Sequence, residues 1–184
     1  MTNLVQLSHE KIRKHLTSNS FSLDATVGNG GDTLFMANLI GITGKVFGFD
    51  VQESALVKTN SLLVENKLDK KVQLVLACHS TFDLYLPVGL KAGIRTITFN
   101  LGYLPGSNKK IITQKKTTLV AIEKAYSWLA EDGIISVISY TGHTGGMEET
   151  KSLINFIEDR EWKYQRFRGS DSINSPILHL ITKD

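Results

Sequence analysis

Short apolar runs alternate with amphipathic stretches along most of the chain. Leucine and isoleucine recur at helical spacing in residues 4–16, and similar patterns predict helices over 33–39, 54–66, 118–129 and 147–157. Runs rich in β-branched and aromatic residues predict strands over 21–25, 45–49, 72–77, 94–99, 134–140, 162–168 and 177–182. Strands that alternate with helices in this way indicate βαβ units and a parallel sheet.

The last two predicted strands are connected differently from the others. Only the short polar segment 169–176 joins them, and a parallel crossover needs more chain than that. We therefore expect an antiparallel hairpin at one edge of the sheet. The predicted fold is α/β, a Rossmann-like, seven-stranded, mostly parallel sheet with helices on both faces. We expect residues 1–184 to form a single domain, with residues 1–20 as an N-terminal helix packed on its edge.

The composition is typical of a globular protein. Of the 184 residues, 41% are hydrophobic and 21% are charged. Because the chain lacks a long apolar segment and an apolar signal core, we expect no membrane span and no export. The single cysteine, Cys78, excludes an internal disulfide and suits a reducing, cytoplasmic compartment. The net charge of +3 permits a nucleic-acid partner without requiring one.

A glycine-rich turn, DATVGNGGDT at residues 24–33, joins the first predicted strand to a helix. Glycine there lets a cofactor lie against the backbone, and the helix amino terminus adds unpaired N–H groups. A dinucleotide fingerprint requires a third glycine where Thr33 stands, which disfavours NAD. The methionine part of S-adenosylmethionine instead needs polar partners, and Asp24, Asn29 and Asp32 suit it. The alternative is an ordinary turn in which Asp32 caps the helix.

Polar residues also follow the second and third predicted strands, at the ends where open parallel sheets bind ligands. Asp50 lies about 20 residues beyond Gly28, the spacing at which an acid accepts hydrogen bonds from ribose hydroxyls. Gln52 would reach the ribose or the adenine edge, while His79 and Ser80 would lie beside the adenine. A solvated loop acid or a helix cap is the alternative for Asp50.

The fourth predicted strand leads into FNLGYLPG at residues 99–106. This segment resembles the Asn-Pro-Pro-Tyr loop of amine-methylating enzymes, with Leu101 and Gly102 in place of the prolines. In such a loop the side-chain oxygen of Asn100 and a backbone carbonyl accept hydrogen bonds from the target nitrogen, which aligns its lone pair with the methyl group. The Tyr103 ring would stack on a base or support the pocket wall. An ordinary turn with a core tyrosine is the alternative.

Further residues near this loop are candidates for substrate binding. His143, in a glycine-rich loop after the fifth strand, would take a proton or bind the target, although a loop histidine without a role is at least as common. A lysine cluster would hold phosphates beside the pocket, or would simply form a solvated loop. The cluster comprises Lys109, Lys110, Lys115 and Lys116. The histidines are scattered, so we expect no metal site.

Four motifs occur in order along the chain: DATVGNGGDT, FGFDVQESA, FNLGYLPG and the late YTGHTGG of residues 140–146. Together they resemble one bacterial family of class I methyltransferases, long described as rRNA methylases, over residues 24–183. The resemblance implies S-adenosylmethionine as cofactor and tRNA as substrate. The implied reaction converts wobble 5-aminomethyl-2-thiouridine to its 5-methylaminomethyl form. In the late loop, residues 144–146 depart from the acidic or polar residues common in the family.

The residues and the resemblance together predict one site with two halves. The cofactor half comprises Asp24, Gly28, Asn29, Gly30, Asp32, Thr33, Asp50, Gln52, His79, Ser80 and Asn100. The catalytic residues would be Asn100, Tyr103 and His143, and the substrate half adds the four lysines. The expected partner is a tRNA anticodon loop, and a homodimer would widen the surface that binds it. Methylation of rRNA or of a small molecule, an NAD-dependent oxidoreductase and a non-catalytic RNA-binding protein are the alternatives.

Overall fold

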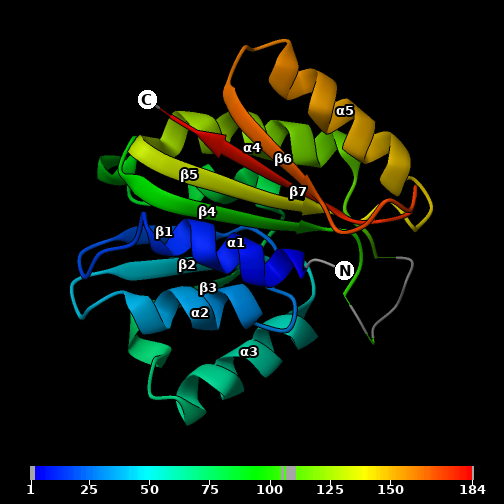
Figure 1. The fold of residues 1–184 in the computed structure, drawn as a ribbon. Coiled ribbons are helices and arrows are strands. Elements are labelled where there is room, and N and C mark those ends of the chain that lie inside the picture. The colour runs from blue at the N-terminus through cyan, green and yellow to red at the C-terminus, as the bar shows by residue number, and fades with distance from the viewer. Residues whose placement is uncertain (1–2, 105, 107–110, 184) are drawn as a thin grey trace.

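The computed structural model describes residues 3–104, 106 and 111–183. Its centre is a seven-stranded sheet with the strand order β3-β2-β1-β4-β5-β7-β6 (Figure 1). The strands are β1 (Phe21–Asp24), β2 (Lys45–Asp50), β3 (Val72–Leu76), β4 (Ile94–Leu101), β5 (Leu129–Ser139), β6 (Lys163–Arg168) and β7 (Ile177–Thr182). Strands β1 to β5 are parallel, and β7 runs antiparallel to both β5 and β6. The predicted sheet, with its antiparallel hairpin at one edge, is confirmed.

Helices cover both faces of this sheet (Figure 1). The α-helices are α1 (Leu4–Arg13), α2 (Gly31–Leu39), α3 (Glu53–Glu65), α4 (Lys115–Trp128) and α5 (Gly146–Glu158). The described residues also form three short 3₁₀ helices, η1 (Asp69–Lys71), η2 (His79–Leu84) and η3 (Val88–Leu90). Helices α1, α2 and α3 supply residues to one buried cluster, and α4, α5 and η2 supply residues to the other.

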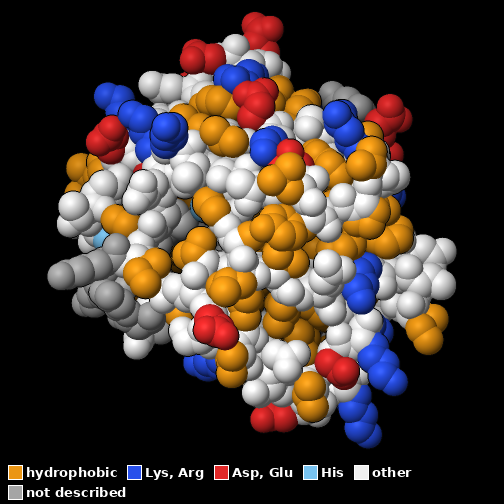
Figure 2. Space-filling model, turned by 180° about the vertical axis from the view of Figure 1, so that it is seen from behind, with side chains coloured by type: hydrophobic (Ala, Val, Ile, Leu, Met, Phe, Trp, Pro, Cys, Tyr) orange, Lys and Arg blue, Asp and Glu red, His pale blue; other side chains and the backbone are white. Residues whose placement is uncertain are grey.

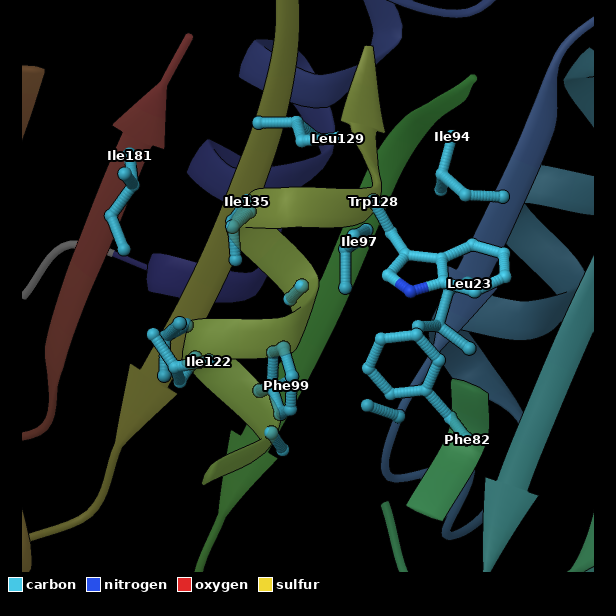
Figure 3. Close-up of a cluster of buried hydrophobic side chains, with 14 of the residues drawn as sticks. Leu23, Phe82, Ile94, Ile97, Phe99, Ile122, Trp128, Leu129, Ile135 and Ile181 are labelled. Atoms are coloured by element: carbon cyan, nitrogen blue, oxygen red, sulfur yellow. The ribbon is translucent and has the colours of Figure 1, made fainter. Parts of the chain in front are cut away.

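Strand β5 contributes side chains to both buried clusters because successive side chains of a strand point to opposite faces. Ile135 and Val137 belong to the cluster beneath α4 and α5, whereas Ile134 and Ile138 belong to the cluster beneath α1 and α2. Figure 3 shows the first cluster, in which Trp128 meets Phe82 edge to face at 6.0 Å between ring centroids. The two packed layers hold the strand ends in fixed relative positions.

Helix α1 is shorter than predicted. It is capped by Asn3, whose side-chain oxygen accepts hydrogen bonds from two backbone N–H groups of the first turn, and it ends at Arg13. It packs against β5, β7 and α2, and its Ser8 hydroxyl lies 2.7 Å from that of Ser136 on β5. The helix buries Leu4 and Ile12 on a face of the sheet. This placement brings its polar side to the start of α2.

Two further boundaries differ from the prediction by three residues or more. Strand β5 begins at Leu129 and not at Ile134, because a register shift lets Leu129 pair with Ile94 while Ile134 pairs with Thr96. Asp132, with a positive φ of 58°, lies within this irregularity, so an acidic, glycine-containing stretch that resembles a turn belongs to the strand. Helix α4 begins three residues before the predicted start, at Lys115.

Buried His179 on β7 makes the protein sensitive to acid. Its ring nitrogens lie 2.8 Å from the Ser139 hydroxyl and 2.7 Å from the Tyr164 hydroxyl. Burial, helped by the charge of Arg166, lowers the pKa of His179 from 6.5 to about 3. Below pH 6.5 the unfolded chain therefore takes up a proton that the folded chain refuses, and stability falls as the pH falls.

Replacing His179 with glutamine should remove this pH dependence. We expect the wild-type free energy of unfolding to drop by about 2 kcal/mol between pH 7.5 and pH 5 through His179 alone, and His179→Gln to lack that part of the drop. Urea midpoints at the two pH values measure it, with His15→Gln as control. An unchanged drop in the His179 variant would show that another group dominates.

Because β1 pairs with both β2 and β4, the order of strand addition reverses between β1 and β4. In open α/β sheets the crevice at such a reversal, beyond the carboxyl ends of the strands, is where ligands bind. Most of the residues selected from the sequence lie at the carboxyl ends of β1 to β5 or in the loops that follow them.

Candidate functional site

A cavity of about 1090 Å³ lies at this reversal point. It is bounded by Val5 of α1, by the loops after β1 to β5, and by the segment that precedes α4. Most of the predicted site residues line it, namely Gly28, Asn29, Asp32, Asp50, Gln52, His79, Asn100, Tyr103 and His143. The volume is at the upper end of the range for small-molecule pockets, so a nucleoside cofactor and a second group fit together.

The carboxylate of Asp50 joins two of the loops. One of its oxygens accepts a hydrogen bond from the Gly28 N–H at 2.9 Å, and the other accepts one from the Gln52 N–H at 2.9 Å. Asp50 therefore sits directly beside the glycine turn, as the spacing in the sequence predicted. Its oxygens face a cavity that is otherwise largely apolar, where hydroxyl donors of a ligand would be well bound.

Asp24 has a supporting position behind the cavity wall. It is fully buried, and its oxygens accept hydrogen bonds from the Thr33 hydroxyl at 2.6 Å and the Thr26 N–H at 3.2 Å. Burial first, and then the nearby carboxylate of Asp32, raises the pKa of Asp24 to about 7. Asp24, Thr33, Gly30 and Ser80 are absent from the described lining of the cavity: the first three are buried, whereas Ser80 is half-buried.

Gly30 supports the turn from behind. Its φ is +81°, and a Cβ placed there would lie 2.7 Å from the Thr59 hydroxyl oxygen on α3. The neighbouring Gly31 faces open space, with nothing within 4 Å of a Cβ. A side chain at Gly30 would therefore clash with α3, whereas the adjacent Gly31 has room for one.

We expect Gly30→Ala to destabilise the fold by about 2 kcal/mol or more, since it combines a left-handed backbone with a steric clash. Gly31→Ala, at the first residue of α2, should leave stability unchanged or slightly raised. Urea unfolding of both variants measures the contrast. Equal effects of the two substitutions on stability would mean that Thr59 on α3 moves aside without cost.

Asp32 occupies the centre of a hydrogen-bonded chain. Its side chain is 9% exposed, and Oδ1 lies 2.8 Å from Nε2 of His9 on α1. The other oxygen, Oδ2, accepts a hydrogen bond of 2.8 Å from the Asn100 side-chain nitrogen. The backbone N–H of Asn100 donates to the Thr26 hydroxyl at 2.6 Å. Asp32 thus contacts the predicted acceptor residue instead of capping α2, whose N-cap is Gly30.

His79 lines the cavity as a neutral base. Burial lowers its pKa from 6.5 to about 4, with a backbone hydrogen bond to Ala25 acting in the opposite direction. Its Nε2 atom is buried and has no hydrogen-bond partner in the described part of the protein. Unpaired buried nitrogens are costly. The residue lines the cavity, but Nε2 itself has almost no surface open to it.

Tyr103 and His143 meet on the far side of the cavity. Their rings are nearly perpendicular, with centroids 6.1 Å apart. A Cβ added to Gly102 would lie 3.4 Å from the Nε2 atom of His143. His143 therefore packs against the loop that contains Asn100 and Tyr103. Tyr103 is 38% exposed, which leaves part of its ring open to solvent and to a ligand.

The Asn100 loop is held by residues that the sequence did not reveal. Thr113 accepts a hydrogen bond from the Gly102 N–H at 2.9 Å, and its own N–H donates to the Gly102 carbonyl at 2.9 Å. The Thr113 hydroxyl in turn donates to buried Glu149 of α5, which also accepts from Thr118 at 2.6 Å. Since the contacts to Glu149 join segments more than 30 positions apart, no local pattern signals them.

Of the four lysines predicted to bind phosphates, two lie in the described residues. Lys115 pairs with Glu148 at 3.0 Å, and both side chains are exposed. Lys116 is also exposed on the first turn of α4, whereas Lys109 and Lys110 lie outside the described residues. On the face seen in Figure 2, basic and acidic side chains are interspersed around hydrophobic ones.

Residues 3–104, 106 and 111–183 contain neither a helix able to span a membrane nor a cluster of metal-binding side chains. None of the helices there combines the length and apolar character needed to cross a bilayer. That same part of the chain contains no group of three or more histidine, cysteine or acidic side chains arranged to hold a metal ion.

Known proteins resemble this chain over most of its length. A protein from Arabidopsis thaliana named tRNA (mnm(5)s(2)U34)-methyltransferase, chloroplastic, is 38% identical over 172 residues, which cover 88% of this chain. The chain spans 62% of that relative's length. The crystal structure of an rRNA methylase from Clostridium thermocellum matches with a TM-score of 0.92 and 35% identity, covering 100% of this chain and 99% of that one.

A Streptococcus mutans protein solved in complex with SAH matches with a TM-score of 0.87 and 36% identity, again covering 100% of this chain and 99% of the other. The family model described as "Putative rRNA methylase" matches residues 46–183, which include the ends of β2 to β5. The chain therefore belongs to this rRNA methylase family, as the four motifs led us to expect.

Proposed function

We propose that this chain is an S-adenosylmethionine-dependent methyltransferase. Its substrate would be the 5-aminomethyl group of a wobble 2-thiouridine in tRNA. The observation that carries the proposal is the convergence of the Gly28 turn, Asp50 and Asn100 on one cavity. A nucleoside cofactor and a target amine would then share that space.

The residues present fit the cofactor. The Gly28 turn has a φ of +53° and offers a close backbone approach, and Asp50 offers carboxylate oxygens for ribose hydroxyls. When bound, S-adenosylmethionine supplies a methyl group on a sulfonium sulfur, which is a good leaving group. The family relative from S. mutans was crystallised with SAH, and the shared fold supports the same ligand here.

Asn100 would align the attacking nitrogen. Its side-chain nitrogen donates to Asp32 and its side chain lines the cavity, so the amide oxygen is left to accept an N–H from the target amine. With the N–H bond so directed, the nitrogen lone pair points at the electrophile. Such alignment is the main contribution that a protein makes to a direct displacement.

The acids around the turn bear on the charge of the amine. Asp24, Asp32 and Asp50 lie close enough for their carboxylates to influence one another, and their negative potential would attract an ammonium group. The amine must lose a proton before it attacks, and desolvation in the partly apolar cavity lowers an ammonium pKa. The acids therefore favour binding of the ammonium form, whereas desolvation acts in the opposite direction and lowers the pKa of the amine.

The support for a tRNA substrate comes from the relatives. The Arabidopsis protein is named for methylation of a wobble uridine in tRNA, and 88% of this chain aligns with it. The half-exposed Tyr103 ring at the cavity would stack on a base extruded from a single-stranded loop. We further propose that residues 1–184 act as one methyltransferase domain in the cytoplasm. A homodimer would present a wider surface to the anticodon stem and loop.

Calorimetric titration with S-adenosylmethionine and with NAD tests the cofactor. Heat with NAD alone would exclude the proposal. Transfer of a tritiated methyl group to total RNA from a strain lacking the enzyme, followed by nucleoside mass spectrometry, tests the substrate. We expect label in 5-methylaminomethyl-2-thiouridine, and label confined to rRNA, protein or small molecules would refute the tRNA assignment. Light scattering with and without tRNA reports the oligomeric state.

A further inference from the structure

His9, on the N-terminal helix, is connected to the presumed acceptor residue through one carboxylate. Its Nε2 atom lies 2.8 Å from Oδ1 of Asp32, and Oδ2 of Asp32 lies 2.8 Å from Nδ2 of Asn100. Asp32 is 8% exposed, so water competes little for these bonds. The three side chains come from α1, α2 and β4, and of these Asp32 and Asn100 line the cavity while His9 lies behind them.

The hydrogens in this chain follow from the chemistry of a carboxylate. An ionised carboxylate only accepts hydrogen bonds, so both of its neighbours must donate. His9 therefore carries its hydrogen on Nε2, and Asn100 presents its NH₂ group to Asp32. The alternative orientation of the amide would place the Asn100 oxygen against the Asp32 oxygen, which is repulsive. Asp32 thereby fixes which end of the amide remains for a ligand.

His9 is itself held in place. Its ring stacks on Phe35 of α2 with centroids 3.8 Å apart and planes inclined by 10°, and Arg13 lies over the same Phe35 ring at 5.2 Å. The His9 side chain is 22% exposed, so most of it is packed. A donor on a stacked ring has little freedom, and it restricts the rotation of the carboxylate that it contacts.

We propose that His9 is a positioning residue for methyl transfer: by holding Asp32 it orients Asn100, so that the amide oxygen faces the target amine. This inference rests on the proposed function of the site. His9 touches neither cofactor nor substrate in this role. Its contribution should therefore appear in the rate of the bound complex and not in the affinity for either ligand.

Two substitutions separate the hydrogen bond of His9 from its packing. His9→Phe keeps a ring that can stack on Phe35 and removes the donor, whereas His9→Gln removes the ring and keeps an N–H donor at similar reach. His15→Phe, on the segment just after α1, controls for loss of a nearby histidine. Each variant is studied as the full chain by thermal unfolding, by calorimetry with S-adenosylmethionine, and by single-turnover methylation of unmodified tRNA.

We expect His9→Phe to lower kcat on the order of tenfold to a hundredfold, with the KM for tRNA and the Kd for S-adenosylmethionine changed less than about threefold. His9→Gln should restore most of the lost rate. In the Asn100→Ala background, His9→Phe should cost little more, because the group that it positions is gone.

Three results would overturn the inference. These are full activity of His9→Phe, equal losses in the Phe and Gln variants, and a full additional loss in the Asn100→Ala background. A wild-type protein that binds S-adenosylmethionine but methylates no tRNA would instead refute the proposed function. The two failures are therefore distinguishable.

Discussion

Asn100→Ala should lower the rate of methyl transfer by about a hundredfold to a thousandfold, a loss comparable to that of one preorganised hydrogen bond in a transition state. The Kd for S-adenosylmethionine should change by less than about threefold. The reason is geometric. The Asn100 amide nitrogen is engaged by Asp32 and its backbone N–H by Thr26, so only its oxygen is left for the incoming amine.

Single-turnover transfer of labelled methyl groups to unmodified tRNA measures the rate, and calorimetry measures cofactor affinity. Asn38→Ala is the matched control, because Asn38 is an exposed asparagine on α2 whose side chain donates to the Leu34 carbonyl. Equal losses of rate and affinity in Asn100→Ala would contradict the division of roles between β2 and β4. A variant with normal turnover would eliminate Asn100 as the acceptor of the amine.

Asp50→Ala should weaken S-adenosylmethionine binding by about a hundredfold. The carboxylate is placed to accept two charge-assisted hydrogen bonds from a ribose, together worth roughly 3 kcal/mol. It also accepts the Gly28 and Gln52 N–H groups, so its removal leaves both loops less well held. Asp50→Asn keeps one accepting oxygen and should lie between the alanine variant and wild type.

Calorimetry gives the Kd of each Asp50 variant, and circular dichroism verifies that the fold persists. Asp171→Ala, at an exposed position in the loop between β6 and β7, controls for the loss of one negative charge. An Asp50→Ala protein that binds the cofactor within about threefold of wild type would show that the ribose lies elsewhere. The NAD alternative would then regain weight.

The convergence of Asp50 and Asn100 on one cavity was predictable because both residues lie at strand ends. Asp50 ends β2 and Asn100 lies near the end of β4, and parallel strands bring their carboxyl ends to one edge of a sheet. Local pattern and topology together were therefore sufficient. Which of the polar residues line the cavity was not predictable. Asp24 and Asp32 belong to the same glycine-rich segment, and only the packing decides that Asp32 lines the cavity while Asp24 does not.

The positioning of the acceptor loop depends on contacts that no local pattern contains. His9 reaches Asp32 only because α1 packs over β5, and the apolar stripe of α1 predicts burial without saying on which surface. The hydrogen bond from Thr113 to Glu149 joins the segment before α4 to α5. Likewise, the stretch that includes Asp132 resembles a turn locally, and pairing with β4 makes it part of β5.

The irregularity in β5 has a consequence for how the family can vary in length. From Ile134 to Ser139 successive side chains alternate between the two cores, so an evolutionary insertion or deletion of one residue there would exchange them. At Asp132 and Gly133 the ladder is already interrupted, and an indel is absorbed locally. Natural length differences between homologues in this strand should therefore concentrate ahead of Ile134.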